Sequence, residues 1–98
     1  MTVTLTATFT ALPGHRDAVA DLIADFADVV RQEPGNLVFE PFTAADDDHA
    51  FVVYEQYVDQ AAFDAHLASP AGGPFNAALG EHIVGDGSEL HFLHPVRP

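Results

Sequence analysis

Residues 51–58 read FVVYEQYV, a segment that opens with four apolar or aromatic residues in a row. Successive side chains of a β-strand point to opposite faces of a sheet. Phe51 and Val53 therefore point one way and Val52 and Tyr54 the other, which makes both faces apolar. Because a strand with two apolar faces needs a cover on each side, the segment predicts a sheet that is covered on both faces.

The chain before this segment predicts a strand, a helix and a second strand. Residues 2–10 (TVTLTATFT) alternate apolar residues with threonines, which is the period-two pattern of a strand. From about residue 16 to 33 the apolar residues recur on one helical face and four aspartates on the other. Pro34-Gly35 ends this helix. Residues 36–43 (NLVFEPFT) form the next strand, and Pro41 favours an edge position because it has no N–H to donate.

A polar hairpin loop over residues 44–49 is predicted to join that strand to residues 51–58. Its acidic triplet, Asp46-Asp47-Asp48, indicates a solvated turn, because a calcium-binding loop would need further ligands at regular spacing. After the third strand, Asp59 is expected to act as the N-cap of a second helix that ends near Leu67.

The last third of the chain predicts a helix break, a short helix and a final strand. Residues 69–74 (SPAGGP) break the second helix, residues 75 to about 83 form a short helical piece, and residues 89–96 form the last strand. The resulting order is β-α-β-β-α-β. It predicts one domain over residues 1–98, an α+β fold of the ferredoxin-like type with a four-stranded antiparallel sheet.

The two faces of the sheet cannot both be covered within one chain. Two helices cover one face, and nothing in 98 residues is left for the other. An uncovered apolar face is an aggregation risk. A second copy of the same sheet, packed across a two-fold axis, covers it economically. The sequence therefore predicts a homodimer.

The charge composition argues against several classes of partner. The chain has fifteen Asp and Glu residues but only three Arg and no Lys, which gives a formal net charge of -12. Nucleic acids and anionic membranes attract clustered basic residues, so neither is expected as a partner. The chain has no Cys, which excludes disulfides and thiolate chemistry, and no cluster of potential ligands predicts a metal site. With no signal peptide and no long apolar stretch, we expect a soluble, cytoplasmic protein.

Two segments resemble one known family. Glu33-Pro34-Gly35-Asn36-Leu37 resembles the E-P-G-x-L signature of antibiotic-biosynthesis-monooxygenase domains. Residues 54–70 (YEQYVDQAAFDAHLASP) resemble that family's Y-E-x-W segment with its following acid, alanines, phenylalanine and H-L-x-S. The resemblance covers nearly the whole chain in the right order.

This resemblance implies a dimeric α/β-barrel with a pocket in each subunit between the sheet and the helices. Members of the family include cofactor-independent monooxygenases that oxidise quinols or polyketide anthrones. The implied function is therefore oxidation of a small aromatic, namely a quinol, an anthrone or a polyketide-like phenol, with O₂ and no cofactor. Such substrates, once deprotonated, pass an electron to O₂ themselves, and the protein supplies orientation and a place for the proton.

Other members of the family degrade haem, and this sequence departs from their pattern at three positions. Asn76 stands where those relatives have a ligating His, Ala7 where they have Asn, and His66 where they have Trp. The resemblance therefore implies no haem site here. Tyr57 also stands where the family usually has Trp, which indicates a pocket or interface of different shape.

Three residues are the candidates for the chemistry. His66 lies three residues after Phe63, on nearly the same helical face, and could deprotonate a phenol. Substrate contact and simple packing are its alternative roles. Asn76 could hold a substrate carbonyl or lie on the helix surface. Glu55 could act as a base, or it could form an ion pair or hydrogen bond at the dimer interface.

The predicted substrate cavity is lined mainly by aromatic side chains. Its expected lining residues are Ala7, Phe9, Phe39, Tyr57, Phe63, Phe75 and Phe92. Two other functions remain open for such a site. One is a dimeric binding or stress-response barrel that holds a small ligand without turnover. The other is an isomerase or lyase, in which His66 would move a proton without O₂.

Overall fold

Four antiparallel strands form one sheet in the order β2-β3-β1-β4. A computed structural model describes residues 1–97. Along the chain the elements are β1 (Val3–Thr10), α1 (Arg16–Val30), β2 (Asn36–Ala44), β3 (Asp47–Tyr57), α2 (Gln60–Leu67), α3 (Gly72–Gly80) and β4 (Glu89–Leu93). The predicted α+β fold of the ferredoxin-like type is confirmed, and Pro41 lies on an edge strand as expected.

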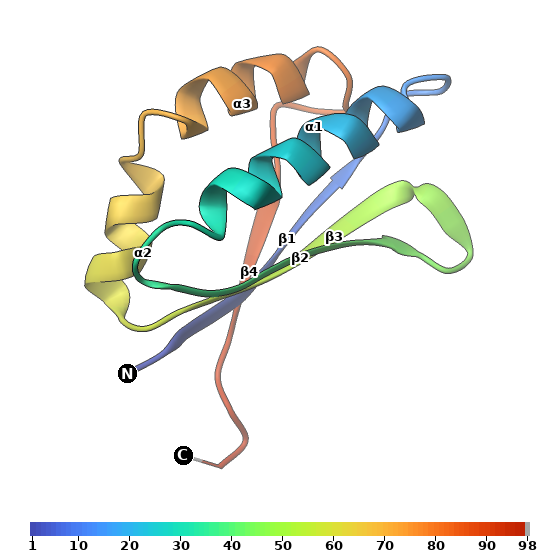
Figure 1. Cartoon of the computed structure of the whole chain (residues 1–98). Coiled ribbons are helices and arrows are strands. Elements are labelled where there is room, and N and C mark those ends of the chain that lie inside the picture. The colour runs from blue at the N-terminus through green and yellow to red at the C-terminus, as the bar shows by residue number, and fades with distance from the viewer. Residues whose placement is uncertain (98) are drawn as a thin grey trace.

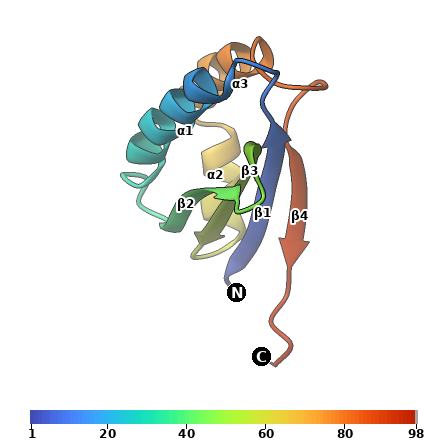
Figure 2. The ribbon, with the colours of Figure 1, turned by 90° about the vertical axis from the view of Figure 1, so that its right-hand side faces the viewer.

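The three helices lie on the same side of the sheet (Figure 1). No helix covers the opposite face within residues 1–97, as the turned view in Figure 2 shows. On β3, Phe51 and Val53 are buried beneath the helices, whereas Val52 and Tyr54 are half-buried on the opposite face. None of the three helices in the described chain has the length and apolar character needed to cross a membrane.

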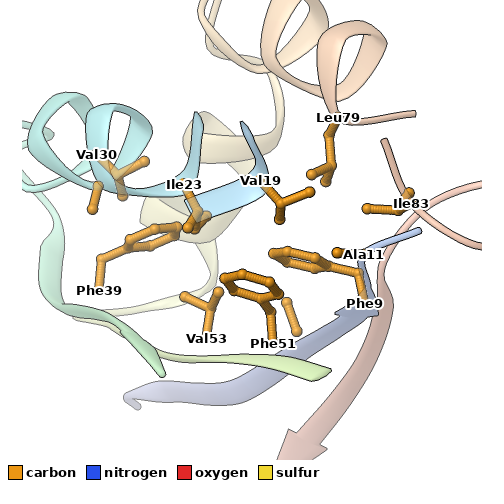
Figure 3. Packing of buried hydrophobic residues seen from close by; sticks show 12 residues of the cluster. Phe9, Ala11, Val19, Ile23, Val30, Phe39, Phe51, Val53, Leu79 and Ile83 are labelled. Carbon is orange, nitrogen blue, oxygen red and sulfur yellow. The ribbon is translucent and has the colours of Figure 1, made fainter. Parts of the chain in front are cut away.

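The core lies between α1, α3 and the inner face of the sheet (Figure 3). Helix α1 contributes apolar residues at helical spacing: Val19, Ile23, Ala27 and Val30 are all buried. Opposite them, Phe9 and Phe51 are register partners on neighbouring strands and stack with ring centroids 5.5 Å apart. Each large apolar side chain buried in this way stabilises the fold by roughly 1.5–3 kcal/mol relative to leaving it exposed.

Several boundaries differ from those predicted. Strand β3 begins at Asp47, so the predicted six-residue hairpin loop is shorter, because ladder pairing continues to Ala44 and Asp47 after the apolar alternation has ended. Helix α3 begins at Gly72 rather than Phe75 and ends at Gly80. Its Pro74 is tolerated because backbone N–H groups in the first turn have no partner inside the helix. Helix α1 ends at Val30, and β4 ends at Leu93, two residues before Pro95.

Candidate active site

A cavity of about 210 Å³ lies between the sheet and the helices. Its walls are mostly apolar, and the polar side chains among its lining residues are Glu55, His66, Asn76 and Ser88. Phe26 forms part of one wall, where it stacks on Phe75 with ring centroids 4.0 Å apart. The cavity therefore offers an aromatic wall and a small set of polar groups, which is the usual make-up of a small-molecule site.

Most of the residues predicted for the site line this cavity. The three candidates for the chemistry do so, although Asn76 is exposed at the surface of α3. Five of the seven predicted lining residues do so as well: Ala7, Phe9, Phe39, Phe63 and Phe75. The sequence did not single out Phe26 or Leu90, which also line it. Phe26 belongs to the apolar face of α1, where a lining residue has the same pattern as a core residue.

Tyr57 and Phe92 lie outside the cavity, which corrects their predicted role as lining residues. Tyr57 is fully buried behind the polar groups, and its hydroxyl bonds to Glu55. Phe92 is 55% exposed and packs edge-on against Phe63, with centroids 5.6 Å apart. Its register partner Leu5 does line the cavity, as do Leu90 and Ala7 of the neighbouring pair, so the side chain of Phe92 turns towards Phe63 instead.

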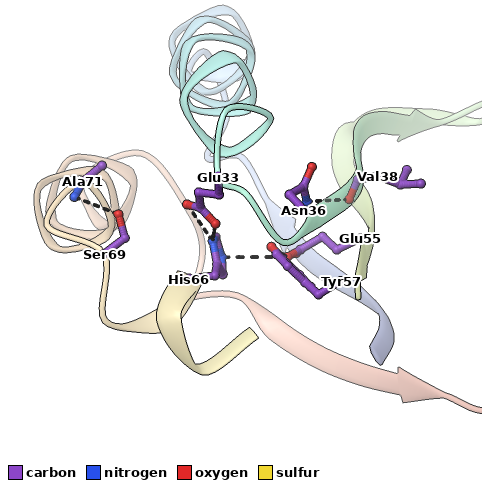
Figure 4. Close-up of polar contacts among 8 residues, drawn as sticks. All are labelled: Glu33, Asn36, Val38, Glu55, Tyr57, His66, Ser69 and Ala71. Carbon is purple, nitrogen blue, oxygen red and sulfur yellow. Dashed lines mark hydrogen bonds and ion pairs between the residues drawn. The ribbon is translucent and has the colours of Figure 1, made fainter. Parts of the chain in front are cut away.

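His66 is paired with Glu33, a residue that the sequence analysis did not assign to the site (Figure 4). The Nδ1 atom of His66 lies 3.0 Å and 3.2 Å from the two carboxylate oxygens of Glu33. The side chains are 11% and 20% exposed, respectively. An ionised carboxylate only accepts hydrogen bonds. The contact therefore places Nδ1 of His66 in position to donate a hydrogen bond to Glu33.

Glu55 is a buried carboxyl group on β3, with 4% of its surface exposed. It faces the helices, on the side of the sheet opposite to Val52 and Tyr54. It therefore does not lie on the face at which the sequence predicts a sheet-to-sheet dimer interface. Burial raises the pKa of Glu55 above its usual range, and the bond from Tyr57 and the nearby His66 only partly offset that effect.

Tyr57 holds the Glu55 carboxyl group in place. The Tyr57 hydroxyl donates to Oε1 of Glu55 over 2.8 Å. Burial raises the pKa of Tyr57, and the neighbouring Glu55 carboxylate raises it further. Tyr57 therefore remains a protonated donor at neutral pH.

Two of the polar groups that line the cavity, His66 and Glu55, approach each other. Nε2 of His66 lies 3.9 Å from Oε1 of Glu55, which is too long for a direct hydrogen bond. One hydroxyl oxygen placed about 2.8 Å from each atom would bond to both. The arrangement thus fits a substrate hydroxyl group, with a base on one side and a carboxyl group on the other.

Local structure brings Glu33 and His66 together from distant parts of the chain. Asp59 caps α2 as predicted, since its Oδ1 accepts from the Ala62 N–H over 2.8 Å. The turn after α1 packs on the start of that helix, and a Cβ at Gly35 would overlap the Cβ of Ala62. This close approach is the reason that a glycine stands between α1 and β2.

A separate group of potential metal ligands lies at the β2–β3 hairpin, away from the cavity. Within residues 1–97, Asp47, Asp48 and His49 bring their ligand atoms within 4.8 Å of one another. His49 bonds to both aspartates, through its ring to Asp48 over 2.8 Å and through its backbone N–H to Asp47 over 3.0 Å. Both aspartates are exposed, so the group has the character of a solvated turn.

The sequence profile of the antibiotic biosynthesis monooxygenase family matches residues 2–78. The chain belongs to this family. Membership supports a monooxygenase-like role and agrees with the site geometry described above. A search of curated protein sequences finds no significant match.

Solved structures of similar proteins share the fold of this family member over almost its entire length. Rv0793 from Mycobacterium tuberculosis is 26% identical, with a TM-score of 0.89, covering 100% of this chain and 98% of its own. PA3566 from Pseudomonas aeruginosa is 26% identical, with a TM-score of 0.87, covering 97% and 94%. SnoaB from Streptomyces nogalater, a cofactor-independent oxygenase, is 24% identical, with a TM-score of 0.85, covering 99% and 95%.

Proposed function

We propose that this protein is a cofactor-independent monooxygenase that oxidises a small aromatic substrate, a quinol or a related phenol, with O₂. The observation that carries the proposal is that His66 and Glu55 both line an aromatic-rich cavity, with Nε2 and Oε1 3.9 Å apart. The fold shared with SnoaB, a cofactor-independent oxygenase, supports it. A cytoplasmic location and a soluble state are part of the same proposal.

The proposed reaction begins with proton transfer to His66. Nε2 takes the proton of a bound hydroxyl group, and the electron-rich anion then transfers an electron to O₂. A bond forms between a ring carbon and one oxygen atom, and the O–O bond breaks afterwards. For a hydroquinone the balance is quinol plus O₂ giving hydroxyquinone plus water. The substrate supplies all four electrons, one oxygen atom remains in the product, and the other leaves as water.

Glu55 and the apolar walls have separate roles in this scheme. Burial raises the pKa of Glu55, so its protonated form persists to higher pH than that of an exposed carboxyl group. In that form it would donate a hydrogen bond to the substrate oxygen and return a proton to the departing oxygen atom. The aromatic wall built on Phe26 and Phe75 orients a flat ring and limits water around the reacting carbon.

The homodimer belongs to the proposal as well. The sheet face opposite the helices carries half-buried Val52 and Tyr54 on β3, and Phe42 on β2 is 55% exposed. Within residues 1–97 no helix covers this face. A second copy of the sheet would bury it in an interface with two-fold symmetry.

Oxygen uptake by metal-stripped protein, with a panel of quinols and anthrones, tests the proposed function against an autoxidation control without protein. His66→Ala should lower turnover by roughly 100-fold or more, because general acid–base groups contribute about that much. Turnover should fall far more than the melting temperature, which is lowered only by loss of the contacts to Glu33 and Tyr57. His94→Ala, at an exposed position, is the matched control and should behave as the wild type.

Each other outcome favours a different function. Equal activity in His66→Ala would remove His66 from the chemistry. Conversion of a substrate in the absence of O₂ would favour the isomerase or lyase alternative, because the His66–Glu55 pair moves protons without an oxidant. Tight binding of phenols without uptake above autoxidation would favour a ligand-binding barrel.

A further inference from the structure

We infer that Glu33 is a positioning residue, which fixes His66 in the tautomer whose Nε2 accepts the substrate proton. This inference rests on the proposed function for the catalytic meaning of that tautomer. The hydrogen bond itself is a property of the folded chain. Glu33 contacts His66 from outside the cavity lining, so it acts through His66 and does not touch the substrate.

The geometry leaves one arrangement of the imidazole proton. Nδ1 of His66 faces both oxygen atoms of the Glu33 carboxylate, at 3.0 Å and 3.2 Å. If the neutral ring carried its proton on Nε2, the lone pair of Nδ1 would point at a negative carboxylate. Since the side chains are 11% and 20% exposed, water screens that repulsion poorly. The proton therefore resides on Nδ1, and Nε2 is free towards Glu55.

Glu33 is held by the turn in which it lies. Its backbone N–H donates to the Val30 carbonyl over 2.9 Å, and its carbonyl accepts from the Asn36 N–H over 3.1 Å. Gly35 then packs against Ala62 on α2, and its carbonyl accepts from the Val58 N–H over 2.9 Å. The carboxylate is thus anchored relative to the helix that carries His66, which is the requirement for setting the ring orientation.

The same pair stabilises charge during the reaction. When His66 takes a proton from the substrate, its ring becomes positive, and a carboxylate 3.0 Å from Nδ1 stabilises that charge. Without Glu33 the ring can rotate or change tautomer, so fewer molecules present an unprotonated Nε2. Substrate binding depends mainly on the apolar walls and should be largely retained.

NMR of protein labelled with ¹⁵N-histidine tests the inference without requiring activity. The chain has six histidines, and the spectrum of His66→Ala identifies the signals of His66. In the neutral wild type, couplings to the ring protons should place the proton on Nδ1 and none on Nε2. Glu33→Ala should lose this fixed form and show both tautomers. Asp64→Asn, on the same helix but exposed and bonded to Gln60, should retain the wild-type pattern.

Kinetics with the same variants supply the second readout. Glu33→Ala should lower kcat by at least roughly 10-fold, and by up to about 10⁴-fold as in a hydrolase triad, with KM changed by less than about threefold. Glu33→Gln keeps a hydrogen-bond acceptor on a side chain of the same length, so it should retain the tautomer and part of the activity. Because it leaves no gap, it should disturb folding less than Glu33→Ala.

The inference is overturned if wild-type His66 is protonated on Nε2, or if Glu33→Ala keeps the Nδ1–H form. An equal loss of kcat in Asp64→Asn would also overturn it. These results are separable from failure of the proposed function, which would show as wild-type protein with the expected tautomer and no oxygen uptake on any substrate.

Discussion

At the scale of single residues, the most consequential feature is a carboxyl group that is almost completely buried. Glu55 is 4% exposed, and its hydrogen bond from Tyr57 compensates only part of the lost hydration. Such a group favours its neutral form, so folding binds a proton that the unfolded chain would release. The buried carboxyl group lowers the free energy of unfolding at higher pH. In its protonated form it can donate a hydrogen bond as well as accept one.

The pH dependence of stability should report this group. The folded-state pKa of Glu55 is raised above its ordinary value of 4.5, so the contribution of this group to stability is largest below pH 4.5 and is lost as pH rises through the folded-state pKa. Each unit of that increase corresponds to about 1.4 kcal/mol. Glu55→Gln cannot ionise and still accepts from Tyr57, so its melting temperature should rise relative to wild type as the pH increases.

Thermal melts of both proteins across a pH series measure this difference. Glu81→Gln, at an exposed position after α3, is the control and should follow the wild type at every pH. A constant difference between Glu55→Gln and wild type from pH 4 to 8 would contradict the raised pKa.

At the scale of elements, the site depends on one joint between the turn after α1 and the start of α2. Gly35 and Ala62 are in close contact there, and Asp59 caps the helix beside them. The joint connects Glu33 to His66, two residues that are 33 positions apart. Helix placement and the geometry of the acid–histidine pair are therefore coupled.

Gly35→Ala should disturb this joint. The new Cβ overlaps Ala62 and lies 3.4 Å from Cγ2 of Val58, so the turn or α2 must shift. Overpacking of this kind costs about 1–3 kcal/mol. In a domain of this size the melting temperature should fall by roughly 4–8 °C per kcal/mol. Turnover should fall too, as Glu33 moves away from His66. Gly87→Ala adds its Cβ to open space, and unchanged behaviour is expected there.

The sequence predicts the elements better than it predicts this joint. Alternation in residues 2–10 and the apolar face of α1 specify strand and helix directly, because each pattern is local. The same patterns gave the faces of Glu55 and His66, and the family resemblance implied the pocket that they line. The Glu33–His66 pair did not, because no local periodicity encodes a contact across 33 residues. Phe92 was misplaced for a similar reason, because its contact with Phe63 joins separate elements and strand alternation does not encode it.

At the scale of the whole molecule, helices cover one face of the sheet and leave the other face open within residues 1–97. Phe51 and Val53 lie under the helices, whereas Val52 and Tyr54 of the same strand lie on the face without helices. A chain with a net charge of -12 repels its own copies over long range. Association of two copies therefore depends on short-range apolar contact across this face.

Tyr54→Glu should dissociate the proposed dimer, because it places a charge at the centre of that contact. Light scattering should give twice the 10.5 kDa chain mass for the wild type and the single-chain mass for the variant. Val29→Glu makes a similar change at an exposed position of α1, on the other side of the sheet, and should remain dimeric. Wild-type protein that scatters as a single chain would refute the dimer.

Because of the cavity of about 210 Å³, the stability of the fold depends on whether a ligand is bound in it. Core side chains such as Phe9 and Val53 face it on one side, where they lack the neighbours that the rest of the core has. A guest molecule of suitable shape supplies those missing contacts, and only the folded chain can receive it. The same apolar surface thus contributes both to ligand binding and to thermal stability. A ligand present at 100 times its Kd adds about 2.7 kcal/mol to the free energy of unfolding.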